Sequence, residues 1–420
     1  MQILQPVRGT SDLLPADKAR QNHVIDTAKR VASGYGFQDM ATPIFEFTDV
    51  FRRPLGDSSD VVSKETYSFE DRGGTQITLR PENTASVMRA VISNGLTQTL
   101  PQKYIYAGPM FRYERPQKGR MRQFHQIGVE LIGPSSALAD AEVIGMGADF
   151  LEALGVLDDC TLHLNSLGDT QSRDAYRSAL VAYLEKFKDD LSDDSKRRLT
   201  QNPLRILDSK DARDKEIVTN APQLAHYLND ISRAHYDLLV DALQKANISF
   251  VADPRLVRGL DYYCHTAFEF ITDKLGAQGT VLGGGRYDGL SEMLGGPHLP
   301  AVGFAAGVER LSLLVDTPEV GHSDILLVVM DSELQADGFG LASRLRRAGL
   351  SVDMPFSGNI SKKLKRAEKI GASLALLLGS QEFASGAVQV KSLANGETTT
   401  IAIDALLSHP LIAPLCEQKV

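Results

Sequence analysis

The sequence contains no tryptophan and only three cysteines in 420 residues. Cys160, Cys264 and Cys416 lie far apart and form no Cys-x-x-Cys pair. Neither a disulfide framework nor a structural zinc site is therefore expected, and we predict no metal-ligating residues. So few scattered thiols are typical of a reducing compartment, which predicts a cytoplasmic protein.

Long apolar runs are also missing. No stretch approaches the roughly 20 apolar residues of a transmembrane helix. The N-terminus meets Arg8, Asp12 and Asp17 too early for a signal peptide, so we expect no membrane association. The chain has no Gly-x-x-x-x-Gly-Lys-Ser/Thr motif, so a P-loop would not hold any ATP that binds.

An overall excess of positive charge is absent too, because the net charge is -8. This balance argues against indiscriminate nucleic-acid binding, but two regions are locally basic. Residues 112–125 hold five Lys or Arg against the single acid Glu114, and residues 344–369 hold eight against two acids. Such segregation is typical of a selective polyanion binder.

The first basic region lies inside a predicted hairpin. A strand at 104–114 leads into a loop, and a second strand follows at 123–133, whose alternation sets Gln126, Gly128 and Glu130 on one face. A solvated basic loop on an edge hairpin would explain the charge alone. However, an arginine at the end of the first strand suits a phosphate, and Phe124, where the loop rejoins the sheet, suits a stacked base.

Other stretches place polar residues where plain packing does not require them. After two short strands within 67–79, Pro81 ends the second strand, and Glu82 at the start of the next helix could simply balance the helix dipole. RGLDYY, residues 258–263, is costly to bury without partners, although an ion pair beside a tyrosine-lined turn would also explain it. Three glycines precede RYD at 286–288, and either close strand packing or a phosphate site accounts for them.

The chain is long enough for two or three domains. We expect a first domain at 1–322 and a second at 323–420. The first begins with a helix capped by Ser11 or Asp12, with Pro15 in its first turn, followed by an edge strand that carries Pro43. Charged helices at about 170–225 read as an insertion. The second domain alternates strands and helices around a parallel sheet, and one of its helices carries a basic face.

Together these stretches resemble the class II aminoacyl-tRNA synthetases. FRYE with the returning Phe124 is similar to their motif 2, the first helix and strand to motif 1, and the segment with Glu309 and Arg310 to motif 3. The continuation FHQIGVE, together with RGLDYY and GGGRYDGL, resembles the histidyl-tRNA synthetase family. TLRPENT departs from the family's TLRPEGT at Asn83.

The resemblance implies an α+β fold, with an antiparallel-sheet catalytic domain, a helical insertion that touches the tRNA acceptor arm, and a C-terminal α/β anticodon-binding domain. It implies activation of L-histidine with ATP to histidyl-adenylate, then transfer to the 3′ end of tRNA(His). Mg²⁺ would be bound through the ATP phosphates. A homodimer would form through the motif 1 region.

The resemblance also implies site residues. The expected catalytic residues are Arg112 and Arg258. The expected ATP-binding residues are Arg112, Glu114, Arg120, Phe124 and Arg310. The expected histidine-binding residues are Glu82, Thr84, Gln126, Glu130, Arg258, Tyr262, Tyr263 and Tyr287. The expected tRNA-binding residues are Arg115, Gln117, Arg122, Lys362, Lys365, Arg366 and Lys369.

Three alternatives stay open at this point. The regulatory subunit of ATP phosphoribosyltransferase shares a synthetase-like core and senses histidine, but such relatives generally lack the anticodon domain and the phosphate-binding arginines. A purely tRNA-binding or signalling module leaves the arginines unexplained. A class I synthetase or another Rossmann ATP enzyme is disfavoured by the lack of HIGH-type and KMSKS-type sequences.

Overall fold

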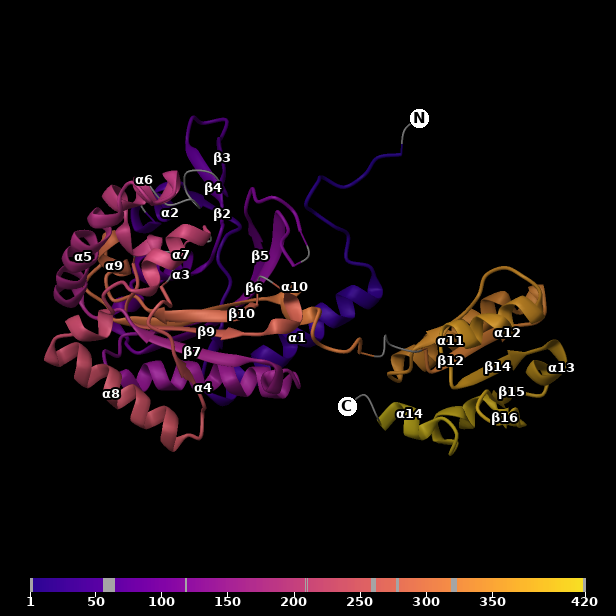
Figure 1. The fold of residues 1–420 in the computed structure, drawn as a ribbon. Coiled ribbons are helices and arrows are strands. Elements are labelled where there is room, and N and C mark those ends of the chain that lie inside the picture. Colours follow the sequence, from indigo (N-terminus) through magenta and orange to yellow (C-terminus); the bar gives the residue numbers. More distant parts are fainter. Residues whose placement is uncertain are drawn as a thin grey trace. The chain divides into compact units, whose positions relative to one another are not determined.

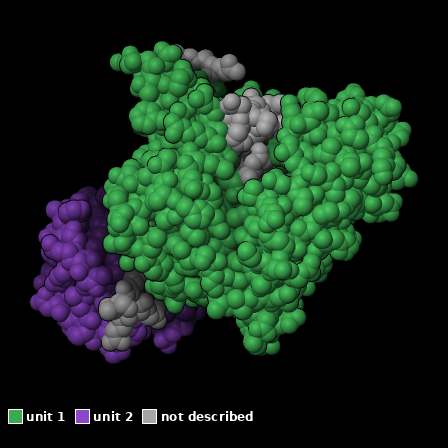
Figure 2. All heavy atoms as spheres, turned by 90° about the vertical axis from the view of Figure 1, so that its left-hand side faces the viewer, with its two compact units in different colours: residues 1–318 green, residues 319–420 purple. Residues whose placement is uncertain are grey.

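The computed structural model describes residues 3–55, 65–117, 119–207, 209, 211–257, 262–276, 279–318 and 323–417. Arg258, a predicted catalytic residue, lies outside the described residues. The chain divides into two compact units, Met1–Pro318 and Glu319–Val420 (Figure 2). Each unit is described by itself.

An eight-stranded sheet in the order β1-β5-β6-β11-β10-β9-β7-β8 forms the centre of the first unit (Figure 1). Its six central strands are antiparallel, and β1 and β8 pair in parallel at the two edges. The strands are β1 Gln38–Asp39, β5 Gln102–Phe111, β6 Gln123–Ile132, β7 Thr161–Ser166, β8 Val251–Ala252, β9 Cys264–Ile271, β10 Thr280–Arg286 and β11 Ala301–Gly307.

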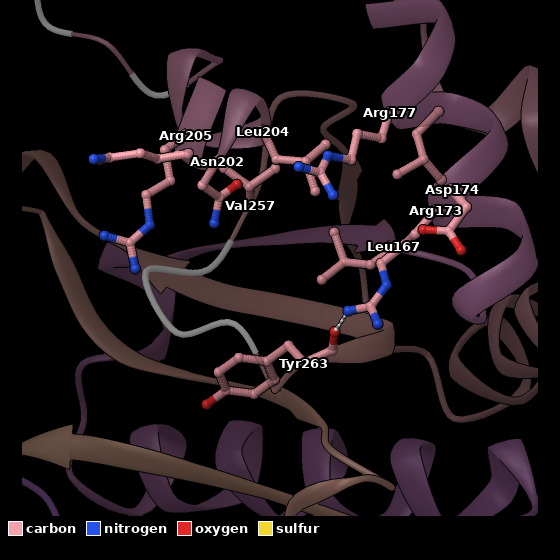
Figure 3. Close-up of a pocket in the computed structure, with 11 residues that line it drawn as sticks. Leu167, Arg173, Asp174, Arg177, Asn202, Leu204, Arg205, Val257 and Tyr263 are labelled. Atoms are coloured by element: carbon pink, nitrogen blue, oxygen red, sulfur yellow. Dashed lines mark hydrogen bonds between the residues drawn. The ribbon is translucent and has the colours of Figure 1, made fainter. Parts of the chain in front are cut away.

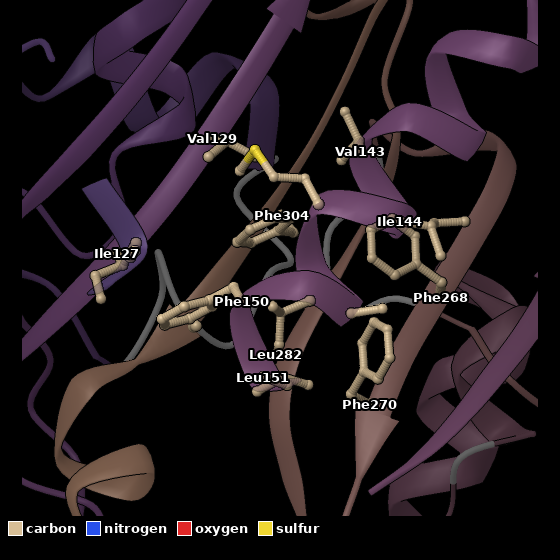
Figure 4. Packing of buried hydrophobic residues seen from close by; sticks show 14 of the residues in the cluster. Ile127, Val129, Val143, Ile144, Phe150, Leu151, Phe268, Phe270, Leu282 and Phe304 are labelled. Atoms are coloured by element: carbon tan, nitrogen blue, oxygen red, sulfur yellow. The ribbon is translucent and has the colours of Figure 1, made fainter. Parts of the chain in front are cut away.

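The core of this unit lies between one face of the sheet and three helices, α1 (Pro15–Gly34), α4 (Ala137–Ala153) and α8 (Asp230–Lys245). Figure 4 shows Ile144 and Phe150 of α4 against sheet side chains such as Phe270. The hydrophobic set of β6 (Ile127, Val129 and Leu131) is buried here, so its polar set faces the other side of the sheet. The alternation predicted for β6 is confirmed.

Above the other face stand a small sheet and short helices. The sheet has the order β2-β4-β3, with β2 Phe45–Phe47, β3 Tyr67–Glu70 and β4 Gln76–Leu79. The helices here are α2 Asp49–Leu55, α3 Thr84–Ser93 and α9 Leu290–Met293. The short helix α10, Val308–Ser312, instead packs on α1, and its Val308 and Leu311 belong to the core on the first face. Short 3-10 helices lie at Leu96–Gln98, Leu157–Asp159 and Asp273–Leu275.

Two local predictions near the N-terminus are wrong. Neither Ser11 nor Asp12 caps the first helix: α1 begins at Pro15, its N-cap is Leu14, and no side chain caps it. Proline tolerates this because it has no N–H to satisfy at the first helical position. Pro43 is not in a strand either, since β2 begins at Phe45. The lack of an amide donor excludes Pro43 from the ladder altogether.

The insertion forms a helical subdomain with its own core, which includes Tyr176, Leu180 and Leu199. Its helices are α5 Thr170–Leu184, α6 Asp193–Gln201 and α7 Ala212–Thr219, joined by 3-10 turns at Glu185–Phe187, Pro203–Ile206 and Leu224–Tyr227. A separate core lets this segment pack as a body on the sheet domain.

The second unit is a five-stranded sheet in the order β13-β12-β14-β15-β16. The predicted central parallel pairing is confirmed, because β12 pairs in parallel with both β13 and β14. Its strands are β12 Ile325–Val329, β13 Val352–Asp353, β14 Leu374–Leu378, β15 Ala387–Ser392 and β16 Thr398–Ala402. Its helices are α11 Gln335–Arg347, α12 Ile360–Lys369, α13 Ser380–Ala384 and α14 Ala413–Glu417, with 3-10 helices at Ser332–Leu334 and Ile403–Ser408.

The described part of the chain holds no helix both long and apolar enough to cross a membrane. The mixed architecture, an antiparallel sheet domain followed by an α/β unit, agrees with the predicted α+β fold.

Candidate active site

A cavity of about 210 Å³ opens where β5 ends and β6 begins. Five residues predicted to bind ATP line it, together with Gln126. They are Arg112, Glu114, Arg120, Phe124 and Arg310. Three elements that are distant in sequence bring them together: the β5–β6 hairpin, β10 and the junction of β11 with α10.

Each arginine of this cavity is held by a specific acceptor. Arg112 Nε donates to the carbonyl of Pro81 at 2.8 Å, and its guanidinium carbon lies 5.3 Å from the Phe124 ring centroid. Arg310 Nη1 donates to the carbonyl of Thr280 at 2.6 Å, and Arg120 Nη1 lies 3.2 Å from Glu114. The cations are therefore positioned by the main chain and by one carboxylate.

Positive charge exceeds negative charge around this cavity. Burial, followed by the neighbouring charge of Arg120, lowers the pKa of Arg310, and Arg112 acts in the same direction. Arginine remains protonated nevertheless, so these cations repel one another in a partly desolvated site. A polyanion placed between them would relieve that repulsion.

Further along the same face of β6 lies a buried carboxyl group, Glu130. Thr84 Oγ1 donates to Glu130 Oε1 at 2.7 Å, Tyr106 Oη donates at 3.3 Å, and the Tyr287 hydroxyl donates to Oε2. Burial raises the pKa of Glu130 to about 8, despite these hydrogen bonds. At neutral pH the carboxyl therefore carries a proton in the free protein.

Aromatic rings enclose this carboxyl pocket. The rings of Tyr262 and Tyr263 lie 4.8 Å apart, and Tyr287 lies 5.8 Å from the first and 6.3 Å from the second. All three side chains are buried. Gln126, in the arginine cavity, and Glu130 lie four positions apart on the same strand face, about 13 Å at the usual strand rise.

Glu82 binds the first amides of α3, as its position just before a helix suggests. Its carboxylate accepts from the amide of Thr84 at 2.6 Å and from that of Ala85 at 3.1 Å, at the start of α3. The group is also buried, and that burial raises its pKa. Arg112 donates to the carbonyl of Pro81, the residue directly before Glu82, so the arginine lies beside the start of α3.

Three residues of this region were not predicted from the sequence. Tyr106 reaches Glu130 from β5, Arg80 holds the carbonyls of Thr42 and Pro109 at 2.9 Å each, and Glu309 accepts from the main-chain amide of His125. The alternation of β5 could have placed Tyr106 opposite Gly128. The acceptors of Arg80 and the partner of Glu309 depend on pairings across the sheet, for which the sequence carries no local signal.

Glycines let these strands approach closely. A Cβ at Gly128 would lie 2.2 Å from Tyr106 Oη, and one at Gly303 would lie 2.0 Å from Glu130 Oε2. A Cβ at Gly284 would lie 2.1 Å from the carbonyl of Gly303. The glycine run had two possible explanations, close strand packing and a phosphate site. Gly284 supports close strand packing, because the run lies within β10.

The predicted tRNA-binding residues lie outside both pockets. Arg115 and Gln117 are exposed in the hairpin loop, whereas Arg122 packs 3.9 Å from the Tyr113 ring centroid. In the second unit Lys362, Lys365 and Lys369 are exposed along α12. Arg366, on the same face, pairs with Asp353.

Within the described ranges, no group of three or more His, Cys, Asp or Glu residues could hold a metal ion. Two carboxylates line the cavity: Glu114 lies among the arginines, and Glu309 accepts from the amide of His125. Such a site fits Mg²⁺ that arrives on ATP, because this ion usually keeps several waters and takes only one or two protein carboxylates besides phosphates.

An antiparallel sheet that carries arginines from its central hairpin and from a strand–helix junction above one cavity defines a class II aminoacyl-tRNA synthetase. A family model described as histidyl-tRNA synthetase matches residues 9–311, and one described as anticodon binding domain matches residues 324–409. The chain belongs to the histidyl-tRNA synthetase family.

Relatives agree along nearly the whole chain. Histidine–tRNA ligase of Gluconacetobacter diazotrophicus is 55% identical, covering 97% of this chain and 99% of the relative. That of Rhodospirillum rubrum is 56% identical, with 97% and 98% covered. The crystal structure of apo histidyl-tRNA synthetase from S. aureus matches with a TM-score of 0.82 at 35% identity, covering 97% of this chain and 99% of that one.

Proposed function

We propose that this protein activates L-histidine with ATP to histidyl-adenylate and pyrophosphate, and then transfers histidine to the 3′ end of tRNA(His). The observation that carries the proposal is the arginine cavity and the carboxyl–tyrosine pocket on one face of β6. Relatives that carry the name histidine–tRNA ligase support it. The alternative, a histidine-sensing regulatory subunit, would have no use for arginines arranged around a triphosphate.

In the activation step, the histidine carboxylate attacks the α-phosphorus of ATP. Negative charge grows there during in-line attack, and fixed cations stabilise it without reorganisation. Arg112 would contact the α-phosphate, and Arg310 with Arg120 the β- and γ-phosphates. Phe124, which lines the same cavity, would stack on the adenine.

Mg²⁺ would be held through the outer phosphates, with Glu114 as the nearby carboxylate. When bound, it would neutralise charge on the leaving pyrophosphate. Arg258 is proposed to contact both the histidine carboxylate and the α-phosphate. Because Arg258 lies outside the described residues, that role stands on the RGLDYY stretch alone.

Histidine would bind with its imidazole between Glu130 and the tyrosines. Because burial raises the pKa of Glu130 to about 8, the carboxyl keeps its proton and can donate it in a hydrogen bond to a neutral imidazole nitrogen. Glu82 and Thr84 would hold the ammonium, Gln126 the carboxylate, and Tyr262, Tyr263 and Tyr287 would enclose the ring. A pocket of buried polar groups rejects a substrate that leaves them unpaired.

Transfer requires no protein nucleophile. The terminal hydroxyl of the tRNA attacks the adenylate carbonyl directly, and a phosphate oxygen can take its proton. Arg115, Gln117 and Arg122 of the hairpin loop would meet the acceptor end. The exposed basic face of α12, with Lys362, Lys365, Arg366 and Lys369, would meet the anticodon.

A homodimer is proposed through the motif 1 region. Four large hydrophobic side chains on or beside the small sheet are exposed, and a second copy of the chain would cover them. They are Ile44, Phe45, Phe47 and Phe69, between 44% and 65% exposed. A sedimentation mass equal to one chain at micromolar concentration would exclude the dimer.

We also propose a cytoplasmic location, which accords with the charging of tRNA.

Exchange of pyrophosphate into ATP, measured with each amino acid in turn, tests the activity. Histidine alone should support exchange, and the Arg112→Ala variant should lower its rate by about 10- to 100-fold. Arg213→Ala is the matched control, because Arg213 is an exposed arginine of the insertion far along the chain. A regulatory subunit or an RNA-binding module would show no exchange with any amino acid.

A further inference from the structure

A second cavity, of about 290 Å³, lies between the helical insertion and the sheet domain (Figure 3). It is distinct from the arginine cavity of the hairpin, since none of its lining residues belongs to that site. Its lining residues are Leu167, Arg173, Asp174, Arg177, Gln201, Asn202, Leu204, Arg205, Leu224, Val257 and Tyr263.

The described part of the lining of this cavity is cationic. Arg173 and Arg177 lie one turn apart on α5, so they point from the same helix face, and Arg205 comes from the 3-10 turn opposite them (Figure 3). Among the described residues of the lining, Asp174 is the one acid. Arginines on two walls can bind one phosphate from both sides, with paired N–H groups.

Arg173 also connects this cavity to the histidine pocket. Its Nη1 donates to the main-chain carbonyl of Tyr263, whose ring packs beside Tyr262 and Tyr287. A guanidinium carries five N–H groups, so this bond occupies only part of its donor capacity. An anion at Arg173 would therefore lie close to the main chain of Tyr263, whose ring is proposed to enclose the substrate imidazole.

The cavity offers apolar surface beside the arginines. Leu167, Leu204, Leu224 and Val257 contribute side chains to the same lining. A bare inorganic anion would leave that surface without a contact. A nucleotide satisfies both parts, because its phosphate meets guanidinium groups and its base and sugar meet apolar side chains.

We propose that this cavity binds one nucleoside-phosphate unit, with its phosphate between Arg173 and Arg177 and its base against the leucines. Two sources share this chemistry: an unpaired nucleotide of an RNA, or a free nucleotide. The RNA source rests on the proposed function, because it takes the tRNA as the partner. The free-nucleotide source does not depend on the proposed function.

The test compares the full chain with two variants. Arg177→Gln removes a cavity arginine whose side chain reaches neither of the two pockets on β6. Arg213→Gln, on α7 of the same insertion, removes an arginine that is 72% exposed and outside the cavity. Equilibrium dialysis with labelled AMP counts bound nucleotides per chain, and fluorescence titration with an unpaired RNA trinucleotide gives an affinity.

If RNA is the source, Arg177→Gln weakens trinucleotide binding by roughly 10-fold and leaves AMP stoichiometry unchanged. If a free nucleotide is the source, wild type binds one AMP more per chain than Arg177→Gln. Unchanged trinucleotide affinity and unchanged stoichiometry in Arg177→Gln, or equal losses in Arg213→Gln, overturn the inference. Pyrophosphate exchange, measured on the same samples without RNA, reports separately on the proposed activity.

Discussion

The hydroxyl of Tyr287 donates a hydrogen bond to the carboxyl of Glu130, and both side chains are almost wholly buried. The two residues come from β6 and from the end of β10, which are separated in the sheet by β11. Their contact fixes the carboxyl that is proposed to select the imidazole.

Tyr287→Phe should weaken histidine binding more than ATP binding. The change removes one donor from Glu130 but keeps the ring, so the KM for histidine should rise by about 10-fold while the KM for ATP stays within about twofold. Pyrophosphate exchange at varied histidine and varied ATP measures both. Tyr35→Phe is the control, because Tyr35 bonds Asp149 outside the pocket. Equal changes in the two KM values would contradict the assignment.

Glu130→Gln should change how stability depends on pH. Burial raises the pKa of Glu130 from 4.5 to about 8, so the native state holds a proton that the unfolded state releases between these values. The contribution of Glu130 is full below pH 4.5 and is lost as the pH rises through 8. Relative to wild type, Glu130→Gln should therefore gain stability as the pH rises, most of all above pH 8.

Urea unfolding of both proteins at pH 5.5, 7 and 8.5 would measure this difference. The comparison with wild type cancels the other titrating groups that the two proteins share. A difference in unfolding free energy that stays constant across the three pH values would show that Glu130 is ionised in the folded protein throughout.

Arg286→Met should destabilise the first unit by about 3–5 kcal/mol, because it leaves Asp140 as a buried, partly unpaired charge. Both side chains are fully buried, and Arg286 Nε lies 2.9 Å from Asp140 Oδ1. Thermal and urea unfolding measure the loss. Lys245→Met removes the exposed pair with Asp241 on α8 and should cost no more than about 1 kcal/mol. Similar losses in the two variants would refute the distinction.

Gly128→Ala should disturb the pocket through a clash rather than through lost flexibility. The new Cβ would lie 2.2 Å from Tyr106 Oη, which must move away from Glu130. A destabilisation of about 1–3 kcal/mol and a higher KM for histidine are expected. In Gly34→Ala the Cβ meets no atom within 4 Å, so this variant should be neutral or slightly more stable. Equal stability of the two variants would contradict the clash.

Local signals in the sequence predicted much of the fold. The hairpin around residues 112–122, the face of β6 that carries Gln126 and Glu130, and the parallel centre of the second unit all follow from alternation and turn residues. The cap of α1 was missed because Ser11 and Asp12 lie in the extended segment that precedes Pro15, where no side chain reaches a helical amide.

The buried polar partners were less accessible from the sequence. No local signal marks Asp140 on the largely apolar helix α4, yet it accepts from Arg286, His235 and Thr266, which belong to three other elements. Tyr106 and Arg80 likewise acquire partners only when the strands adopt their order in the sheet. Such contacts depend on tertiary register, which composition and spacing do not encode.

The bond between Glu309 and the amide of His125 joins residues 184 positions apart and ties α10 to the start of β6. The ribosome must therefore add more than half of the first unit after the hairpin before the His125 amide acquires this partner and Arg310 reaches the cavity. During synthesis the incomplete chain carries a cationic loop near the many polyanions of the translation machinery. Synthesis of α10 is the step that brings Glu309 and Arg310 to that loop and completes the cavity for a substrate.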